Sequence, residues 1–174
     1  HNRNYLFLIL FLFSTSLISL KTLKKVNIQD IRISGSKLFS QNDLIKNSSL
    51  KLPVRLIFVK TNLLEKELKH NLSLKNISVS RQLFPFGLKV HINTRTPTAL
   101  GEKTLNDRKI SGFIDNDGIF IDVQNADIKN LNKFNLRVFG WKEKFKKTLS
   151  KILTSQKNYE FDLVKITFSP NGFL

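Results

Sequence analysis

The chain opens with an uncharged apolar run, YLFLILFLFSTSLISL, which begins at Tyr5 and ends at Leu20. Continued to Leu23 as a helix, this run would be about 28 Å long, close to the hydrocarbon thickness of a bilayer. Its hydroxyl side chains are tolerable there because they can bond to the helix's own carbonyls. The run therefore predicts a transmembrane anchor within residues 1–25. A secretory signal peptide with its apolar core at residues 6–13, and a buried core helix, stay open as alternatives.

Basic residues flank this run on both sides. Arg3 precedes it, whereas Lys21, Lys24 and Lys25 follow it. Counted by the positive-inside rule, these charges favour an external N-terminus. The pattern after residue 25 predicts soluble domains.

Residues 26–97 carry a pattern of strand, helix, helix, strand and strand. The segment VNIQDIRISG alternates imperfectly and ends at Gly35, which predicts a strand over residues 26–35. A short helix is expected next, with Ser40 as its N-cap. Pro53 then marks a break.

A second helix is predicted over residues 61–72, TNLLEKELKHNL. Asn62, with Glu65 three residues later, resembles a capping box. The leucines at helical spacing predict one buried face; they are Leu63, Leu64 and Leu68.

The stretch RQLFPFGLKVHINTRTPTAL, residues 81–100, predicts the closing hairpin of this domain. Pro85 and Gly87 supply turn chemistry between two alternating runs. In the second run, every other residue is apolar and is expected to face inward: Leu88, Val90 and Ile92. The alternation stops at Arg95 and Pro97, so a domain boundary is expected near Pro97.

The remaining residues, 98–174, predict a β-rich domain with one helix. GFIDNDGIFIDV, residues 112–123, is a hairpin pattern around an Asp-Asn-Asp-Gly turn. A strand is expected at residues 135–140, a helix at 141–153, and alternating strands from residue 159 onward. The chain lacks an initial Met and stops within a strand pattern, so we expect it to be a fragment whose last domain is C-terminally incomplete.

The composition gives a net charge of +16, and it excludes sites that require cysteine. The lysines are dispersed, which favours background composition over a nucleic-acid interface. A denser group, Lys142 to Lys151, is either a solvated face or a contact for anionic lipid or an acidic partner. The absence of Cys excludes disulfides and thiolate metal sites.

No catalytic, cofactor-binding or metal-binding residues are predicted, and an enzyme is the least favoured class. The three histidines show no ligand spacing, and no nucleophile elbow or phosphate loop is present. The acidic turn containing Asp115, Asp117 and Gly118 lacks the distal ligands of a calcium loop, so a hairpin turn is favoured.

The anchor, the element order and several motifs together resemble the FtsQ/DivIB family of bacterial cell-division proteins. IRISGS, which contains Gly35, is similar to the first strand end of its polypeptide-transport-associated (POTRA) domain. The closing run is similar at a set of spaced positions, with Thr94 where the family has Glu: Arg81, Pro85, Leu88, Val90, Ile92, Arg95, Pro97 and Ala99. The resemblance implies an α+β fold, with a transmembrane helix (1–25), a β-α-α-β-β POTRA domain (26–97) and a β-rich domain (98–174).

The resemblance also implies a function. The chain would be a non-enzymatic scaffold of the division machinery, or divisome, at the septum. It would be an uncleaved single-pass protein of the inner membrane, with its bulk extracytoplasmic and with FtsB/FtsL-like membrane proteins as partners. A POTRA component of polypeptide transport or secretion is the alternative, and nucleic acid and small-molecule substrates are not expected.

Contact with partners is expected through exposed strand edges and an apolar groove. The sequence assigns no partner-contact residue. Gly35, Arg81, Pro85, Arg95 and Pro97 are the expected POTRA motif and domain junction, where Pro97 would stiffen the exit. Arg81 and Arg95 would either orient that junction or be ordinary surface arginines.

Overall fold

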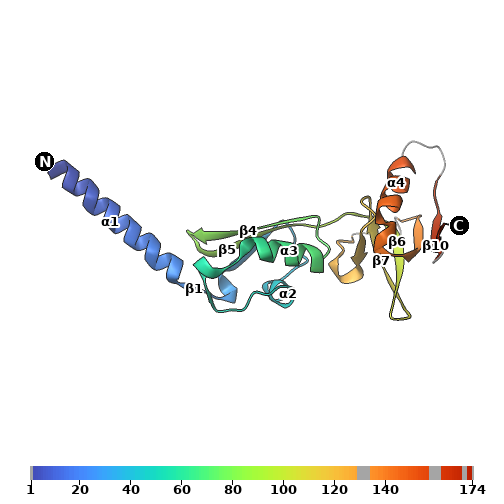
Figure 1. Cartoon of the computed structure of the whole chain (residues 1–174), viewed down its shortest axis with the longest axis horizontal. Coiled ribbons are helices and arrows are strands. Elements are labelled where there is room, and N and C mark those ends of the chain that lie inside the picture. The colour runs from blue at the N-terminus through green and yellow to red at the C-terminus, as the bar shows by residue number, and fades with distance from the viewer. Residues whose placement is uncertain (1, 129–133, 157–161, 170–171, 174) are drawn as a thin grey trace. The chain divides into compact units, whose positions relative to one another are not determined.

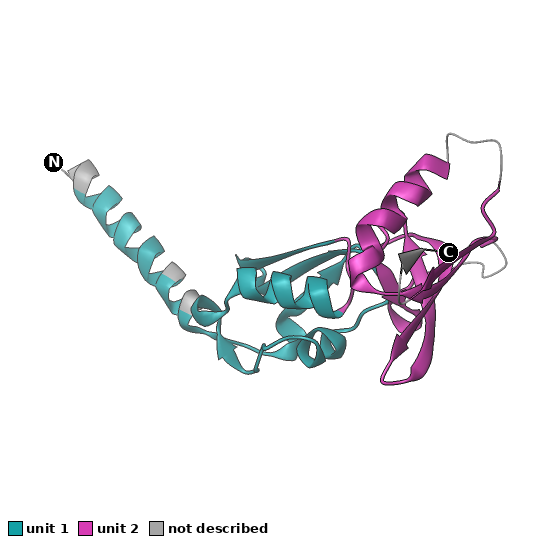
Figure 2. Ribbon diagram, turned by 45° about the vertical axis from the view of Figure 1, so that its right-hand side comes forward, with its two compact units in different colours: residues 1–71, 76–93 teal, residues 72–75, 94–174 magenta. Residues whose placement is uncertain are grey.

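The computed structural model describes residues 2–128, 134–156, 162–169 and 172–173 (Figure 1). Its chain divides into two compact units (Figure 2). Unit 1 contains residues 1–71 and 76–93, and unit 2 contains residues 72–75 and 94–174. Each unit has its own sheet and its own buried apolar core.

Helix α1, Asn2–Leu23, begins unit 1 and contains the apolar run. Two of its hydroxyls bond to its own carbonyls, as expected: Ser14 Oγ donates to Phe11 O at 2.8 Å, and Thr15 Oγ1 to Leu12 O at 2.9 Å. Among the described residues, however, no helix combines the length and apolar character needed to cross a membrane. The structure thus shows the helix between Tyr5 and Leu20 but does not support a transmembrane span there.

The strand-helix-helix-strand-strand pattern expected for unit 1 is present, with helices against a three-stranded sheet (Figure 1). Strand β5 is central; β2 is parallel to it and β4 antiparallel. Small elements complete the unit: β1 pairs with β3, and two 3-10 turns, η1 and η2, occur. The bounds are β1 Lys25–Val26, η1 Ile28–Asp30, β2 Ile31–Ser34, α2 Gln41–Lys46, β3 Val54–Arg55, η2 Leu56–Phe58, α3 Thr61–Asn71, β4 Asn76–Leu83 and β5 Phe86–Asn93.

Apolar side chains from both helices meet those of the sheet in the core of unit 1. Leu44 of α2 and Leu64 and Leu68 of α3 are buried, as are the sheet residues Ile31, Val79, Leu88, Val90 and Ile92. The inward face predicted for the second hairpin strand is therefore confirmed, because Leu88, Val90 and Ile92 are at most 3% exposed.

Three local predictions in unit 1 need correction. The strand expected over residues 26–35 is interrupted, because the Asp30 carboxylate accepts a hydrogen bond from Asn27 N at 2.8 Å and stabilises the turn η1. Glu65 does not cap α3, since its carboxylate binds Val79 N on β4 instead. Leu63 also departs from the expected buried face and is 43% exposed.

Among its described residues, unit 2 contains a six-stranded sheet in the order β11-β10-β9-β6-β7-β8 and one α-helix, α4. Strand β9 is parallel to both β6 and β10. The bounds are β6 Pro97–Leu105, β7 Arg108–Asp115, β8 Phe120–Asp122, η3 Val123–Asn125, β9 Arg137–Trp141, η5 Glu143–Phe145, α4 Lys146–Gln156, β10 Lys165–Ser169 and β11 Gly172–Phe173.

The sheet of unit 2 buries apolar residues on two faces. Ala99, Ile114 and Val138 belong to a cluster with Leu149 and Leu153 of α4. Phe113 and Ile121 belong to a second cluster, with Ala126 from the segment after η3. The β-rich region with a helix expected from the sequence is thus present, although part of its last alternating run lies outside the described residues.

Candidate functional site

Two expected POTRA motif residues, Gly35 and Arg81, lie in unit 1, where they fix backbone geometry. Gly35 follows β2 with a φ of +89°, and a Cβ atom there would lie 2.2 Å from Ile92 O. Only glycine fits both the left-handed conformation and this close approach. Arg81 on β4 donates from Nε and Nη2 to Val59 O, at 3.2 and 3.0 Å. Arg81 therefore holds the end of η2 against the sheet.

Pro85 lies in the turn between β4 and β5, as the hairpin prediction requires. Its carbonyl accepts a hydrogen bond from Arg32 Nη1 at 3.2 Å, and Phe86 O accepts one from Arg32 Nη2 at 3.3 Å. The tip of the hairpin is thereby joined to β2.

Arg95 and Pro97 lie in unit 2, and Arg95 is not an ordinary surface arginine. It is 9% exposed, and its Nη1 forms ion pairs with Asp115 and, at 2.9 Å, with Asp117. Pro97 begins β6 and pairs in register with Asp115. The Arg95–Asp115 pair thus anchors the start of β6 to the acidic turn of unit 2.

The acidic turn uses its carboxylates internally. Asp115 Oδ1 accepts hydrogen bonds from the backbone N–H groups of Asp117 and Ile119, at 3.0 and 2.9 Å. These bonds confirm the hairpin interpretation of this turn. No group of three or more potential metal ligands occurs within the described ranges.

Both edges of the unit 1 sheet have a backbone group already bonded to a side chain. On β4, Val79 N donates to Glu65 Oε1 at 2.7 Å. On β2, Ile31 O accepts from Gln41 Nε2 at 3.3 Å. A partner strand that adds to a sheet edge needs these groups free. Strand addition at the middle of β4 or the start of β2 would therefore have to break a hydrogen bond.

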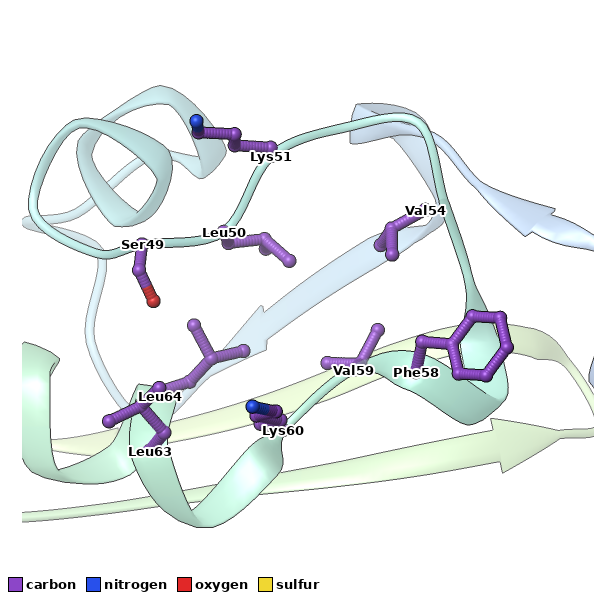
Figure 3. Close-up of a pocket in the computed structure, with 9 residues that line it drawn as sticks. All are labelled: Ser49, Leu50, Lys51, Val54, Phe58, Val59, Lys60, Leu63 and Leu64. Carbon is purple, nitrogen blue, oxygen red and sulfur yellow. The ribbon is translucent and has the colours of Figure 1, made fainter.

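An apolar groove lies on the helical side of unit 1 (Figure 3). One wall is the loop from Ser49 to Val54, and the other is formed by η2 and the start of α3. Its volume is about 220 Å³. We call it the α3 groove, and its lining residues are Ser49, Leu50, Lys51, Val54, Phe58, Val59, Lys60, Leu63 and Leu64.

Side-chain contacts from α3 position the loop wall of the α3 groove. Glu67 Oε2 accepts hydrogen bonds from Ser49 N at 2.7 Å and from Ser49 Oγ at 2.9 Å. Val59 at the base is buried, and Arg81 holds its carbonyl. The groove is therefore bounded on both sides by hydrogen-bonded backbone.

Sequence reasoning expected an apolar groove but assigned no residues to it. The run LIFVK, residues 56–60, fits neither a helical nor a strand period, and it contains Phe58 at 63% exposure. The signal available in the sequence was a run of apolar residues without regular periodicity.

Comparison with protein families identifies part of the chain. Residues 26–95 match the model of the POTRA domain, FtsQ-type. This segment is an FtsQ-type POTRA domain. The match confirms the resemblance to the FtsQ/DivIB family, and it covers the three-stranded sheet and the α3 groove. No curated protein matches the chain.

The FtsQ-type POTRA domain fits a division scaffold in general terms, with protein–protein interaction as its mode of action. The bounds of the whole domain and the roles of Gly35, Arg81, Pro85, Arg95 and Pro97 at a junction remain predictions.

Proposed function

We propose that this chain is a non-enzymatic scaffold that recruits and links proteins of the bacterial division machinery on the extracytoplasmic side of the inner membrane. The observation that carries the proposal is the FtsQ-type POTRA match over residues 26–95. The β-α-α-β-β arrangement of unit 1 supports it. Small membrane proteins of the FtsB/FtsL type are the proposed partners.

Membrane localisation in this proposal rests on the family. Helix α1 adds a row of apolar side chains that are 45–68% exposed between Tyr5 and Leu20. Apolar surface of this extent is unfavourable in water and calls for lipid or protein cover. The proposal does not depend on α1 crossing the bilayer.

A polypeptide-transport role is less well supported. POTRA domains that receive client chains are expected to do so by strand addition, and Glu65 and Gln41 occupy backbone groups at the two edges of this sheet. The matching family model is of the FtsQ type, which also favours a role in cell division over a role in polypeptide transport.

The experiment that tests the proposal is imaging of dividing cells that express the chain fused at its N-terminus to a fluorescent protein. We expect a band at mid-cell that is lost when residues 26–97 are removed. A matched control removes residues 98–174 and keeps the POTRA domain, and it is expected to keep the band. Uniform envelope fluorescence of the intact fusion throughout the cell cycle would refute the division role.

A further inference from the structure

We propose that the α3 groove binds a short segment of a partner protein in which a bulky apolar side chain is flanked by carboxylates. The apolar side chain would occupy the groove between Leu50, Val54 and Leu64. The carboxylates would lie beside Lys51 and Lys60, which stand on opposite walls (Figure 3). The inference goes beyond the proposed function, and it concerns binding alone, whether or not the partner is a division protein.

The size and surface of the α3 groove suit a single anchoring side chain. At about 220 Å³, the groove is smaller than typical cofactor or drug-sized sites, which start near 300 Å³. Phe58 and Leu63 at its rim are 63% and 43% exposed. Neighbouring Ile57 is 48% exposed. Exposed apolar residues around a concave site are typical of protein interfaces, in which one buried anchor carries much of the affinity.

The charged residues of the α3 groove determine which residues the partner segment carries on either side of its apolar anchor. The lining contains two lysines and no acidic residue. The nearby carboxylate of Glu67 is already hydrogen-bonded to Ser49. Arg55 of β3 adds another exposed cation beside Val54. A complementary partner therefore carries Asp or Glu on both sides of its apolar anchor.

Hydrogen bonds at both edges of the unit 1 sheet favour binding in the groove over addition of a partner strand. Strand addition would have to displace Glu65 from Val79 N or Gln41 from Ile31 O, as described above. Binding in the α3 groove requires neither displacement. Binding in the groove also differs from contact with a flat anionic surface, because only groove binding inserts a side chain into a concave site.

The test is an NMR titration of the full ¹⁵N-labelled chain in nonionic detergent. The probes are two synthetic peptides that share a leucine–phenylalanine–leucine centre. One peptide has glutamate runs on both sides of the centre, and the other has lysine runs. We expect the glutamate peptide to shift the amide signals of Leu50, Lys60 and Leu63 saturably, with a Kd below about 1 mM. We expect the lysine peptide to bind at least about tenfold more weakly.

Substitutions separate the charge contribution from the apolar contribution. Lys51→Glu with Lys60→Glu is expected to reverse the preference between the two peptides. Its matched control is Lys37→Glu with Lys89→Glu, which changes the net charge equally at exposed positions outside the groove. Phe58→Ser with Leu63→Ser is expected to abolish binding of both peptides, whereas Leu38→Ser, at an exposed residue outside the groove, is expected to leave it unchanged.

Several results would overturn the inference. One is the absence of saturable shifts in the groove at about 1 mM glutamate peptide. Another is equal affinity for the two peptides. A third is an equal response to anionic lipid incorporated into the same detergent micelles, which would show that charge alone drives the contact. Retained dispersion of the amide signals in each variant shows that the fold is intact, so loss of binding is not confused with unfolding.

Discussion

Arg95 shows how one side chain organises the start of unit 2. Its guanidinium is buried and paired with Asp115, which is 5% exposed, and with the more exposed Asp117. Removal of one partner from a buried ion pair leaves an uncompensated charge in a poorly solvated place. The two aspartates of the same turn therefore differ in their energetic importance, although they look alike in the sequence.

We predict that Asp115→Asn lowers the free energy of unfolding of unit 2 by about 3–5 kcal/mol. The matched control, Asp117→Asn, removes a partly solvated contact and should cost less than about 1 kcal/mol. Both changes in the free energy of unfolding can be measured by urea unfolding followed by tryptophan fluorescence. Trp141, the only tryptophan in the sequence, lies in β9 and therefore reports on unit 2. Equal effects of the two substitutions would contradict the assignment of Arg95 to Asp115.

At the scale of elements, helix α2 depends on a reciprocal cap between Ser40 and Asp43. Asp43 Oδ2 accepts hydrogen bonds from Ser40 Oγ at 2.6 Å and from Ser40 N at 2.8 Å. Asp43 N in turn donates to Ser40 Oγ at 3.3 Å. The hydrogen bond from the Ser40 hydroxyl, followed by that from its backbone N–H, lowers the pKa of the Asp43 carboxyl. The sequence predicted Ser40 as the cap, but not the returning bond from Asp43.

We predict that Asp43→Asn destabilises α2 at neutral pH by about 1 kcal/mol. Because the folded-state pKa of Asp43 is below its unfolded value, the stabilisation is complete above the unfolded pKa. It is lost as the pH falls through the folded pKa. Urea titrations read from the amide signals of α2 should show the wild-type advantage at pH 7 and its loss in strong acid. An advantage independent of pH would contradict the ionised cap.

Other elements show where periodicity succeeds and where it fails. The hairpin of β4 and β5 was predictable because one face alternates strictly and Pro85 and Gly87 mark its turn. Strand β6 was missed because it begins with Pro97, contains Gly101 and has few β-branched residues. Its place between β7 and β9 stabilises it through pairing on both sides, which is a non-local property.

At the level of the whole molecule, the chain divides into two compact units, and each contains buried apolar residues. The family match ends at residue 95, close to the end of unit 1 at residue 93. A segment whose apolar side chains pack among themselves can fold without the remainder of the chain.

We predict that residues 26–95 alone form the three-stranded sheet with its two α-helices. The amide signals of β4 and β5 in this segment should match those of the full chain in ¹⁵N spectra. Narrowly dispersed signals, typical of an unfolded chain, would contradict independent folding. A matched segment that carries Leu64→Asp, which places a charge in the core, is expected to give such a spectrum.

Features that depend on neighbouring residues could be predicted from the amino-acid sequence alone. These were the apolar run of α1, the cap of α2, the hairpin turn at Pro85 and the FtsQ/DivIB resemblance. The first three features are local because a period of side chains, a cap or a turn needs only a few consecutive residues. The resemblance also uses the order of these features along the chain.

Contacts between side chains that are distant in the sequence became known from the three-dimensional fold. Arg95 pairs with Asp115, and Glu65 binds Val79 N on β4 instead of capping a helix. Lys51 and Lys60 lie on opposite walls of the α3 groove. The physical reason is that these contacts join segments whose approach is set by core packing and strand pairing. No local pattern of residues specifies that approach.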